Sequence, residues 1–137
     1  MAVVGSAAAF VLLMIGVLHV VWMFSPWPFA TPAEMARTVA GVETDAMPTR
    51  KETGTVAVLI LVAACLVGTR AGTAGAVDPF RLVSIGTWGV AAVLLGRGAI
   101  GFAVFSPRKD VFGRMDRWVY SPLCVALAGG CVAAAFS

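Results

Sequence analysis

Four long runs of apolar residues divide the chain, and short polar segments separate them. The runs cover about residues 2–24, 53–71, 82–105 and 116–136. About 20 apolar residues suffice for a helix to cross the hydrocarbon core of a bilayer, and the runs reach or approach that length. The pattern predicts an all-α fold, an up-and-down bundle of four transmembrane helices, with residues 1–137 forming a single transmembrane domain.

The polar segment after the first run carries a helix signal of its own. Thr31 and Glu34 have the spacing of an N-terminal capping box, Pro32 occupies the first helical position, and Gly41 provides a stop. We therefore expect a short interfacial helix in the first connection. Pro122 falls in the first two turns of the fourth run, where its missing N–H and its ring are tolerated.

Composition supports a location in lipid and excludes two other classes of protein. Hydrophobic residues make up 60% of the 137 positions and charged residues only 12%, which is too few to coat a soluble domain. The net charge is +3, but the basic residues punctuate the apolar runs and do not cluster with stacking aromatics. The expected partners are therefore membrane lipids, and nucleic acid is not among them.

The distribution of Lys and Arg predicts the orientation in the membrane. Only Arg70 and Arg81 flank the second connection. The first and third connections hold seven basic residues: Arg37, Arg50, Lys51, Arg108, Lys109, Arg114 and Arg117. The positive-inside rule places those two connections in the cytoplasm and both termini outside.

Polar side chains within the apolar runs gather toward one membrane face. In an up-and-down bundle, the ends of the first and third helices and the start of the fourth lie at the same face. His19, Arg97, Asp116, Tyr120 and Cys124 fall in these stretches, the last three at intervals of four residues. We expect them to meet in one half of the bundle.

Arg97 is the strongest single signal for a site. An arginine placed centrally in a membrane helix costs about 2.5–3.5 kcal/mol and faces the bundle interior or water. Asp116 and the Tyr120 hydroxyl are the nearest compensating groups by depth. The alternative is that an Arg97–Asp116 pair only ties the third and fourth helices together.

His19 has two interpretations. It titrates near neutral pH and can act as a proton carrier or general base, or it makes a helix-to-helix hydrogen bond. Trp22, three residues later, lies on the same helical face and is a candidate wall of a pocket. With a single histidine and no acidic or thiol partner at ligand spacing, we predict neither a metal site nor a cofactor.

The cysteines and a glycine-rich segment do not indicate chemistry. Cys65, Cys124 and Cys131 form no C-x-x-C pair, which argues against disulfide or redox chemistry. The segment 96–101 matches G-x-G-x-x-G but lies in a membrane helix rather than after a strand. The glycines beside Arg97 predict close helix approach, as do Gly86, Gly89, Gly129 and Gly130.

Several segments together resemble a family of small bacterial four-helix membrane proteins of unknown function. The similar segments are His19-x-x-Trp22, the residues 96–102, and Asp116-x-x-x-Tyr120-Ser121-Pro122-Leu123-Cys124. The resemblance implies four spanning helices, the bacterial cytoplasmic membrane, and a shared residue set. That set is His19, Trp22, Arg97, Asp116, Tyr120, Ser121 and Cys124.

Three functional hypotheses follow. The first is a binding or assembly module with a polar pocket at one membrane face for a lipid or small amphiphile, lined by Trp22, Arg97, Tyr120, Ser121 and Cys124. The second is a membrane enzyme for a lipid-soluble substrate, with His19 as acid or base, Arg97 as electrostatic stabiliser, and Asp116 orienting Tyr120. The third is a proton or ion pathway through a homo-oligomer, and a larger membrane complex is a further setting for the chain.

Overall fold

The computed structural model describes residues 1–72, 81–105 and 107–136, and every regular element in these ranges is helical. The prediction of an all-α fold is confirmed. The first half contains α1 (Ala2–Trp22), α2 (Pro32–Met35), the π-helical turn η1 (Ala36–Ala40) and α3 (Arg50–Arg70). The second half contains α4 (Leu82–Ile100), the π-helical turn η2 (Gly101–Phe105), α5 (Val111–Met115), the π-helical turn η3 (Asp116–Tyr120) and α6 (Ser121–Ala135).

Among the described residues, four continuous helical stretches are long and apolar enough to cross a membrane. They are Ala2–Trp22, Arg50–Arg70, Leu82–Phe105 and Val111–Ala135. Much of their apolar surface points outward; for example, Val3 is 82% exposed and Val93 is 72% exposed. Such surface suits contact with acyl chains and indicates a membrane protein.

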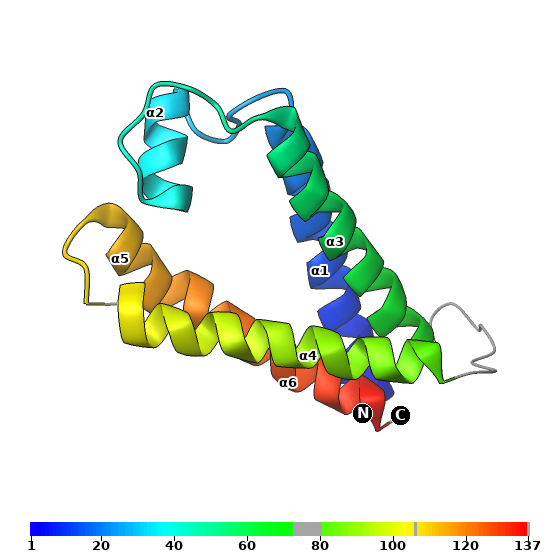
Figure 1. Ribbon diagram of the computed structural model, residues 1–137. Coiled ribbons are helices and arrows are strands. Elements are labelled where there is room, and N and C mark those ends of the chain that lie inside the picture. Colours follow the sequence, from blue (N-terminus) through cyan, green and yellow to red (C-terminus); the bar gives the residue numbers. More distant parts are fainter. Residues whose placement is uncertain (73–80, 106, 137) are drawn as a thin grey trace.

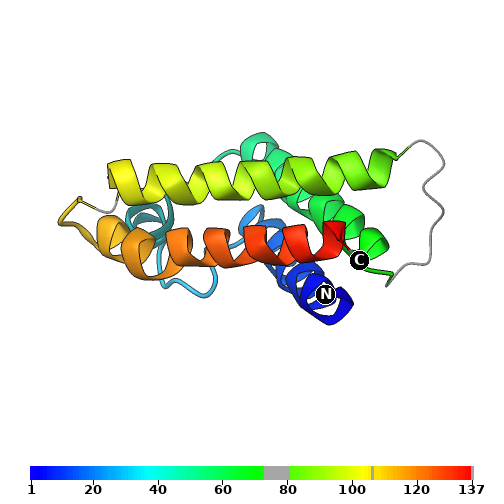
Figure 2. The same ribbon diagram turned by 90° about the horizontal axis from the view of Figure 1, so that it is seen from below.

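The four stretches are arranged as two packed pairs that cross at one end (Figures 1 and 2). α1 packs along α3, and α4 packs along η3 and α6. The pairs meet near the two chain termini and diverge toward their other ends, so that Figure 1 shows two arms. The chain runs up and down within each arm, as the sequence predicted.

Small residues form the crossing. Ala8, Cys131 and Ala134 are among its buried members. A Cβ on Gly130 would lie only 2.5 Å from the Ala8 Cβ, and one on Gly5 would lie 2.7 Å from the Ala134 Cβ. The helices therefore approach so closely that these positions have room only for glycine.

The glycines predicted to pack between helices divide into two groups. A Cβ at Gly86, Gly98 or Gly130 would press on a neighbouring helix, which agrees with the prediction. A Cβ at Gly89, Gly96 or Gly129 would meet nothing within 4 Å, so for these the packing prediction is corrected. The reason is that each helix has a neighbour on only part of its circumference, and nearby glycines lie at different angles around it.

Two helices begin earlier than the apolar pattern indicated, because capping residues precede them. The Thr49 hydroxyl accepts from the Glu52 amide (3.2 Å) and a Glu52 carboxylate oxygen accepts from the Thr49 amide (3.1 Å), so α3 starts at Arg50 and not near residue 53. The Asp110 carboxylate accepts from the Gly113 amide (2.9 Å), so the last helical stretch starts at Val111 and not at Asp116.

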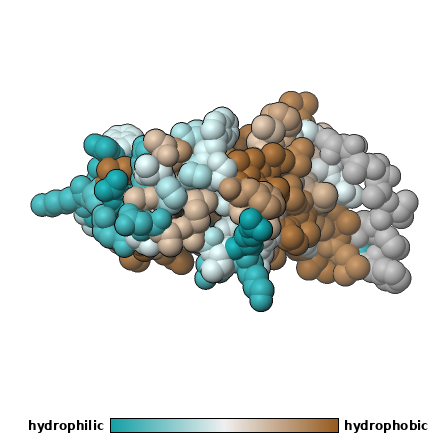
Figure 3. All heavy atoms as spheres, turned by 90° about the horizontal axis from the view of Figure 1, so that it is seen from above, coloured by the Kyte–Doolittle hydropathy of each residue, from teal (hydrophilic) through white to brown (hydrophobic). Residues whose placement is uncertain are grey.

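The short helix predicted in the first connection is present. The Thr31 hydroxyl accepts from the Glu34 amide (3.1 Å), Pro32 is the first helical residue, and Gly41 ends the segment with a φ of 69°. Figure 1 shows this segment, α2 and η1, extending from the tip of the α1–α3 arm toward α5 at the tip of the other arm. Hydrophilic residues gather over the same end of the molecule (Figure 3).

Candidate functional site

A buried ion pair joins the end of the third long helix to the start of the fourth. Arg97 Nη2 donates to Asp116 Oδ1 at 2.6 Å, and the Ser121 hydroxyl donates to Asp116 Oδ2 at 2.7 Å. Asp116 and Ser121 are fully buried, whereas the Arg97 side chain is 35% exposed. Both carboxylate oxygens of Asp116 are thus satisfied, as a buried charge requires.

Gly101 makes room for this cluster. A Cβ at position 101 would overlap the Ser121 hydroxyl and would lie 2.5 Å from Asp116 Oδ2 and 2.6 Å from Arg97 Nη1. Gly101 is the last glycine of the G-x-G-x-x-G match. Because Gly101 has no side chain, the polar groups of the two helices can come together beside its backbone. The sequence pattern predicted close helix packing at these glycines but not this role for Gly101.

The π-helical turns explain why Asp116 pairs with Ser121. In η3 the Ser121 amide donates to the Asp116 carbonyl, five residues earlier. Residues five apart lie on different faces of an α-helix, but a π turn brings them together. Pro122 follows at once and has no N–H with which to continue the α-helical ladder. The predicted stripe through Asp116, Tyr120 and Cys124 assumed an α-helix, and the π turn changes its register.

Tyr120 binds the first connection rather than the ion pair. Its hydroxyl donates to the Thr38 carbonyl at 2.8 Å, and its ring centroid lies 6.1 Å from that of Phe112. Phe112 is buried and also packs edge-on against Phe105, with centroids 5.2 Å apart. Tyr120 therefore fastens η1 to η3, and an aromatic cluster fills the space between the connections.

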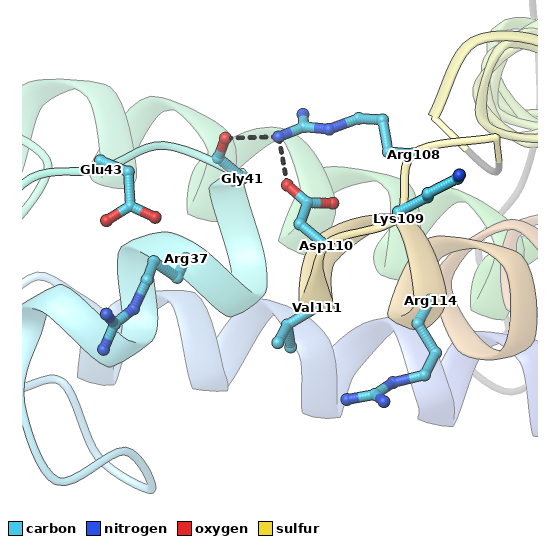
Figure 4. A pocket seen from close by; sticks show the side chains of 8 residues that line it. All are labelled: Arg37, Gly41, Glu43, Arg108, Lys109, Asp110, Val111 and Arg114. Carbon is cyan, nitrogen blue, oxygen red and sulfur yellow. Dashed lines mark hydrogen bonds and ion pairs between the residues drawn. The ribbon is translucent and has the colours of Figure 1, made fainter.

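A pocket of about 360 Å³ lies where the first and third connections meet (Figure 4). Its non-ionic lining residues include Gly41 and Val111. Its ionic lining consists of four basic residues, Arg37, Arg108, Lys109 and Arg114, and two acidic ones, Glu43 and Asp110. The pocket therefore carries a formal excess of two positive charges. In the sequence these basic residues predict the orientation in the membrane, but their spacing does not reveal a pocket.

Arg108 and Asp110 hold one wall of this pocket in place. Arg108 Nη2 donates to the Gly41 carbonyl (2.9 Å) and to Asp110 Oδ2 (2.5 Å), and its guanidinium lies 5.0 Å from the centroid of the Phe112 ring. The Gly113 amide, with Arg108, lowers the pKa of the Asp110 carboxyl below its usual value. Asp110 therefore stays anionic and keeps Arg108 engaged.

Comparison with known proteins identifies the family. The sequence profile of a family described as a protein of unknown function, DUF3995, matches residues 12–131. The chain belongs to the DUF3995 family. No curated protein and no solved structure matches it. The region shared with the DUF3995 family includes the whole Arg97–Asp116–Ser121 cluster and every residue that lines the pocket.

The remaining sequence-predicted residues of this DUF3995 member lie apart from the ion pair. His19 Nδ1 donates to the Ile15 carbonyl (2.8 Å), and the His19 ring lies 4.9 Å from that of Trp22. Trp22 is buried, and its indole N–H donates to the Trp27 carbonyl (2.8 Å). His19 and Trp22 belong to the end of α1, whereas Arg97 belongs to the end of α4, on the other arm (Figure 1).

The predicted meeting of His19 with Arg97 is therefore not observed. The up-and-down bundle placed both residues at one face, but the arms diverge there and separate them. Cys124 is half-buried, one turn beyond Ser121 on α6. Within residues 1–72, 81–105 and 107–136 of this DUF3995 chain, no three His, Cys, Asp or Glu side chains are grouped as metal ligands.

Proposed function

We propose that this protein is a membrane-embedded binding module that holds the polar head of a lipid or small amphiphile in the pocket between its first and third connections. The observation that carries the proposal is the pocket itself. It lies at the hydrophilic end of the face shown in Figure 3, and many exposed side chains of the four long helices are apolar. A ligand with a polar head and an apolar tail matches that division.

The pocket is fastened at two points, which supports a binding role. Residues far apart in the chain are joined there by the bond from Arg108 to the Gly41 carbonyl and by the bond from Tyr120 to the Thr38 carbonyl. A connection needed only to link two helices requires no such anchorage. A preformed site binds more tightly because less conformational freedom is lost on binding.

Apolar side chains beside the pocket offer a path for a tail. Val111 lines the pocket and is 43% exposed, and Val42 in the first connection is 49% exposed. An acyl chain that begins at the pocket can contact these apolar side chains.

In this proposal the Arg97–Asp116–Ser121 cluster holds in place the helical segments that position the pocket. It fixes η2 against η3, and η3 carries Tyr120, which holds η1. The functional set therefore differs from the one inferred from sequence: Arg97, Asp116 and Ser121 position the site rather than touch the ligand. The positive-inside rule adds that the pocket opens to the cytoplasmic side of a bacterial inner membrane.

The test uses photoactivatable lysophospholipids, one with a phosphatidylcholine head and one with a phosphatidylglycerol head, and maps the crosslinks by mass spectrometry. We expect crosslinks within residues 37–43 and 108–114. Gly41→Ala should remove them, because Gly41 has a φ of 69° and an added Cβ would lie 2.7 Å from Phe112 Cδ1 and 2.8 Å from Arg108 Nη1.

Gly89→Ala is the matched control, because a Cβ there meets nothing within 4 Å. Its crosslinks should equal those of the native protein. Amide hydrogen exchange on the transmembrane helices of both variants verifies that the fold is intact. If the crosslinks were spread along the transmembrane helices, as expected for bulk lipid around the protein, and were not enriched in the two connections, the proposal would be rejected.

A further inference from the structure

The basic residues of the pocket differ in whether they are already engaged. Arg108 is bound to Asp110, to the Gly41 carbonyl and to the Phe112 ring, so its guanidinium is already engaged by contacts within the protein. Arg37, Lys109 and Arg114 are exposed, and none of their side chains makes a hydrogen bond or ion pair with another described residue. Three cations are therefore available to a ligand.

The two unengaged arginines come from different connections. Arg37 belongs to η1 in the first connection, and Arg114 belongs to α5 after the third. Figure 4 shows them extending at the same edge of the pocket, one on either side of Val111, whereas Lys109 points away from both. Both side chains are long and exposed, and guanidinium groups are suited to binding a phosphate.

The negative charges of the pocket do not cancel this arrangement. Asp110 is committed to Arg108 and to the Gly113 amide. Glu43 lies on the Arg37 side of the pocket in Figure 4, but it makes no ion pair with Arg37 in the described part of the chain. The edge formed by Arg37 and Arg114 therefore keeps a net positive charge.

We infer that the pocket selects an anionic phospholipid, with Arg37 and Arg114 supplying positive charge to its headgroup and Val111 contacting the start of its tail. This inference rests on the proposed function. It specifies the charge of the headgroup and the residues that recognise this charge. Guanidinium groups suit phosphate because they present paired N–H donors in the plane of the phosphate oxygens. Basic pockets between membrane helices bind anionic headgroups in this way.

The test compares the affinities of lysophosphatidylglycerol and lysophosphatidylcholine of equal chain length, measured by native mass spectrometry on the full chain. The variant is Arg37→Gln with Arg114→Gln. The control is Arg50→Gln with Lys51→Gln, which removes the same charge from the first turn of α3, outside the pocket. The capping pair of Thr49 and Glu52 remains intact in the control.

The native protein should prefer the phosphatidylglycerol lipid. Each cation removed from the pocket should lower that preference about fivefold, so the double variant should lose most of it. The control pair, which acts only through screened long-range attraction, should change it by no more than about twofold. A preference that falls equally in both double variants would overturn the inference, because only bulk surface charge would then be at work.

Two further results separate this inference from the proposed function. If both lipids bind equally and crosslink in the two connections, the pocket binds amphiphiles but does not distinguish the net charge of the headgroup, and only the inference fails. If neither lipid binds there, the proposed function fails as well. Glycerol phosphate without a tail should bind far more weakly than the lipid, and equal affinity would overturn the assignment to a lipid.

Discussion

The two ends of the molecule are stabilised by different mixtures of contacts. Where the arms cross, glycine and alanine allow the helices to touch, as at Gly130 against Ala8, and the Arg70 side chain adds a bond to the Ala135 carbonyl. Where the arms diverge, the Arg97–Asp116 pair joins two helices of one arm, and the Tyr120 hydroxyl joins the two arms at the Thr38 carbonyl. The contrast indicates that small residues in close contact hold the arms together at the crossing, whereas a hydrogen bond joins them where they have separated.

This contrast has a consequence for mutation. The crossing should be sensitive to added volume, because its contacts depend on the absence of side-chain atoms. The diverging end should be sensitive to lost polar groups as well, because removing one partner leaves another buried and unpaired. It should also be sensitive to added volume at Gly101, where an added Cβ would overlap the Ser121 hydroxyl.

Asp116→Ala should give the largest loss of stability. It leaves Arg97 and the buried Ser121 hydroxyl without their partner, which we expect to cost about 3 kcal/mol. Thermal unfolding in detergent measures the effect. Adding Arg97→Met to Asp116→Ala should restore part of the stability, because no unpaired charge remains; a double variant less stable than the single one would contradict the ion-pair explanation.

Gly101→Ala should be the next most damaging change. The added methyl group displaces the Ser121 hydroxyl and both members of the ion pair, and overpacking of this kind costs about 2 kcal/mol. Gly96→Ala, five residues earlier on the same helix, adds the same group where nothing lies within 4 Å and should leave stability unchanged or raised. Equal melting temperatures for the two variants would show that the cluster does not depend on Gly101.

Gly130→Ala tests the crossing. The methyl group would meet the Ala8 Cβ at 2.5 Å, so α1 and α6 must separate, at an expected cost of about 1 kcal/mol. Gly129→Ala is the neighbouring control, with no atom within 4 Å of its added Cβ. Distance measurements between spin labels on α1 and α6 should lengthen only for Gly130→Ala, and a change in both variants would reject the close-approach explanation.

Acidification should have the smallest effect, confined to the pocket. Because its folded-state pKa is lowered below the usual 3.8, Asp110 stabilises the folded state above that value, and the contribution disappears as pH falls through the lowered pKa. Amide exchange at Gly113 should then accelerate. In Asp110→Asn the Gly113 amide should exchange rapidly at neutral pH as well. If its exchange in this variant still accelerated over the same acidic pH range, Asp110 would not be the group that titrates.

Local sequence signals predicted much of the secondary structure. Runs of apolar residues predicted the four long helices, and the cap at Thr31 with the stop at Gly41 predicted the short one. These signals act within a few residues, so they can be recognised without knowledge of the fold. The same kind of signal at Thr49 and at Asp110 would also have predicted the starts of α3 and of the last helical stretch.

The site was only partly predictable. The depth of Arg97 and Asp116 in their helices indicated their pairing, because an arginine within a membrane helix requires a compensating group. The role of Ser121 depends on the π turn at η3, whose register an α-helical pattern does not contain. A bundle of nearly parallel helices predicts that His19 lies beside Arg97. The two arms diverge instead, so the end of α1 and the end of α4 lie apart.

Local patterns along the chain predict an all-α fold with four helices long and apolar enough to span a membrane, because apolar length and capping depend on neighbouring residues. The glycines that touch a neighbouring helix, the cations that are already engaged, and the pocket between two distant connections follow from the tertiary fold. The reason is geometric. Those facts depend on the crossing of the two arms and on two π turns, which many side-chain contacts set jointly and no single segment encodes.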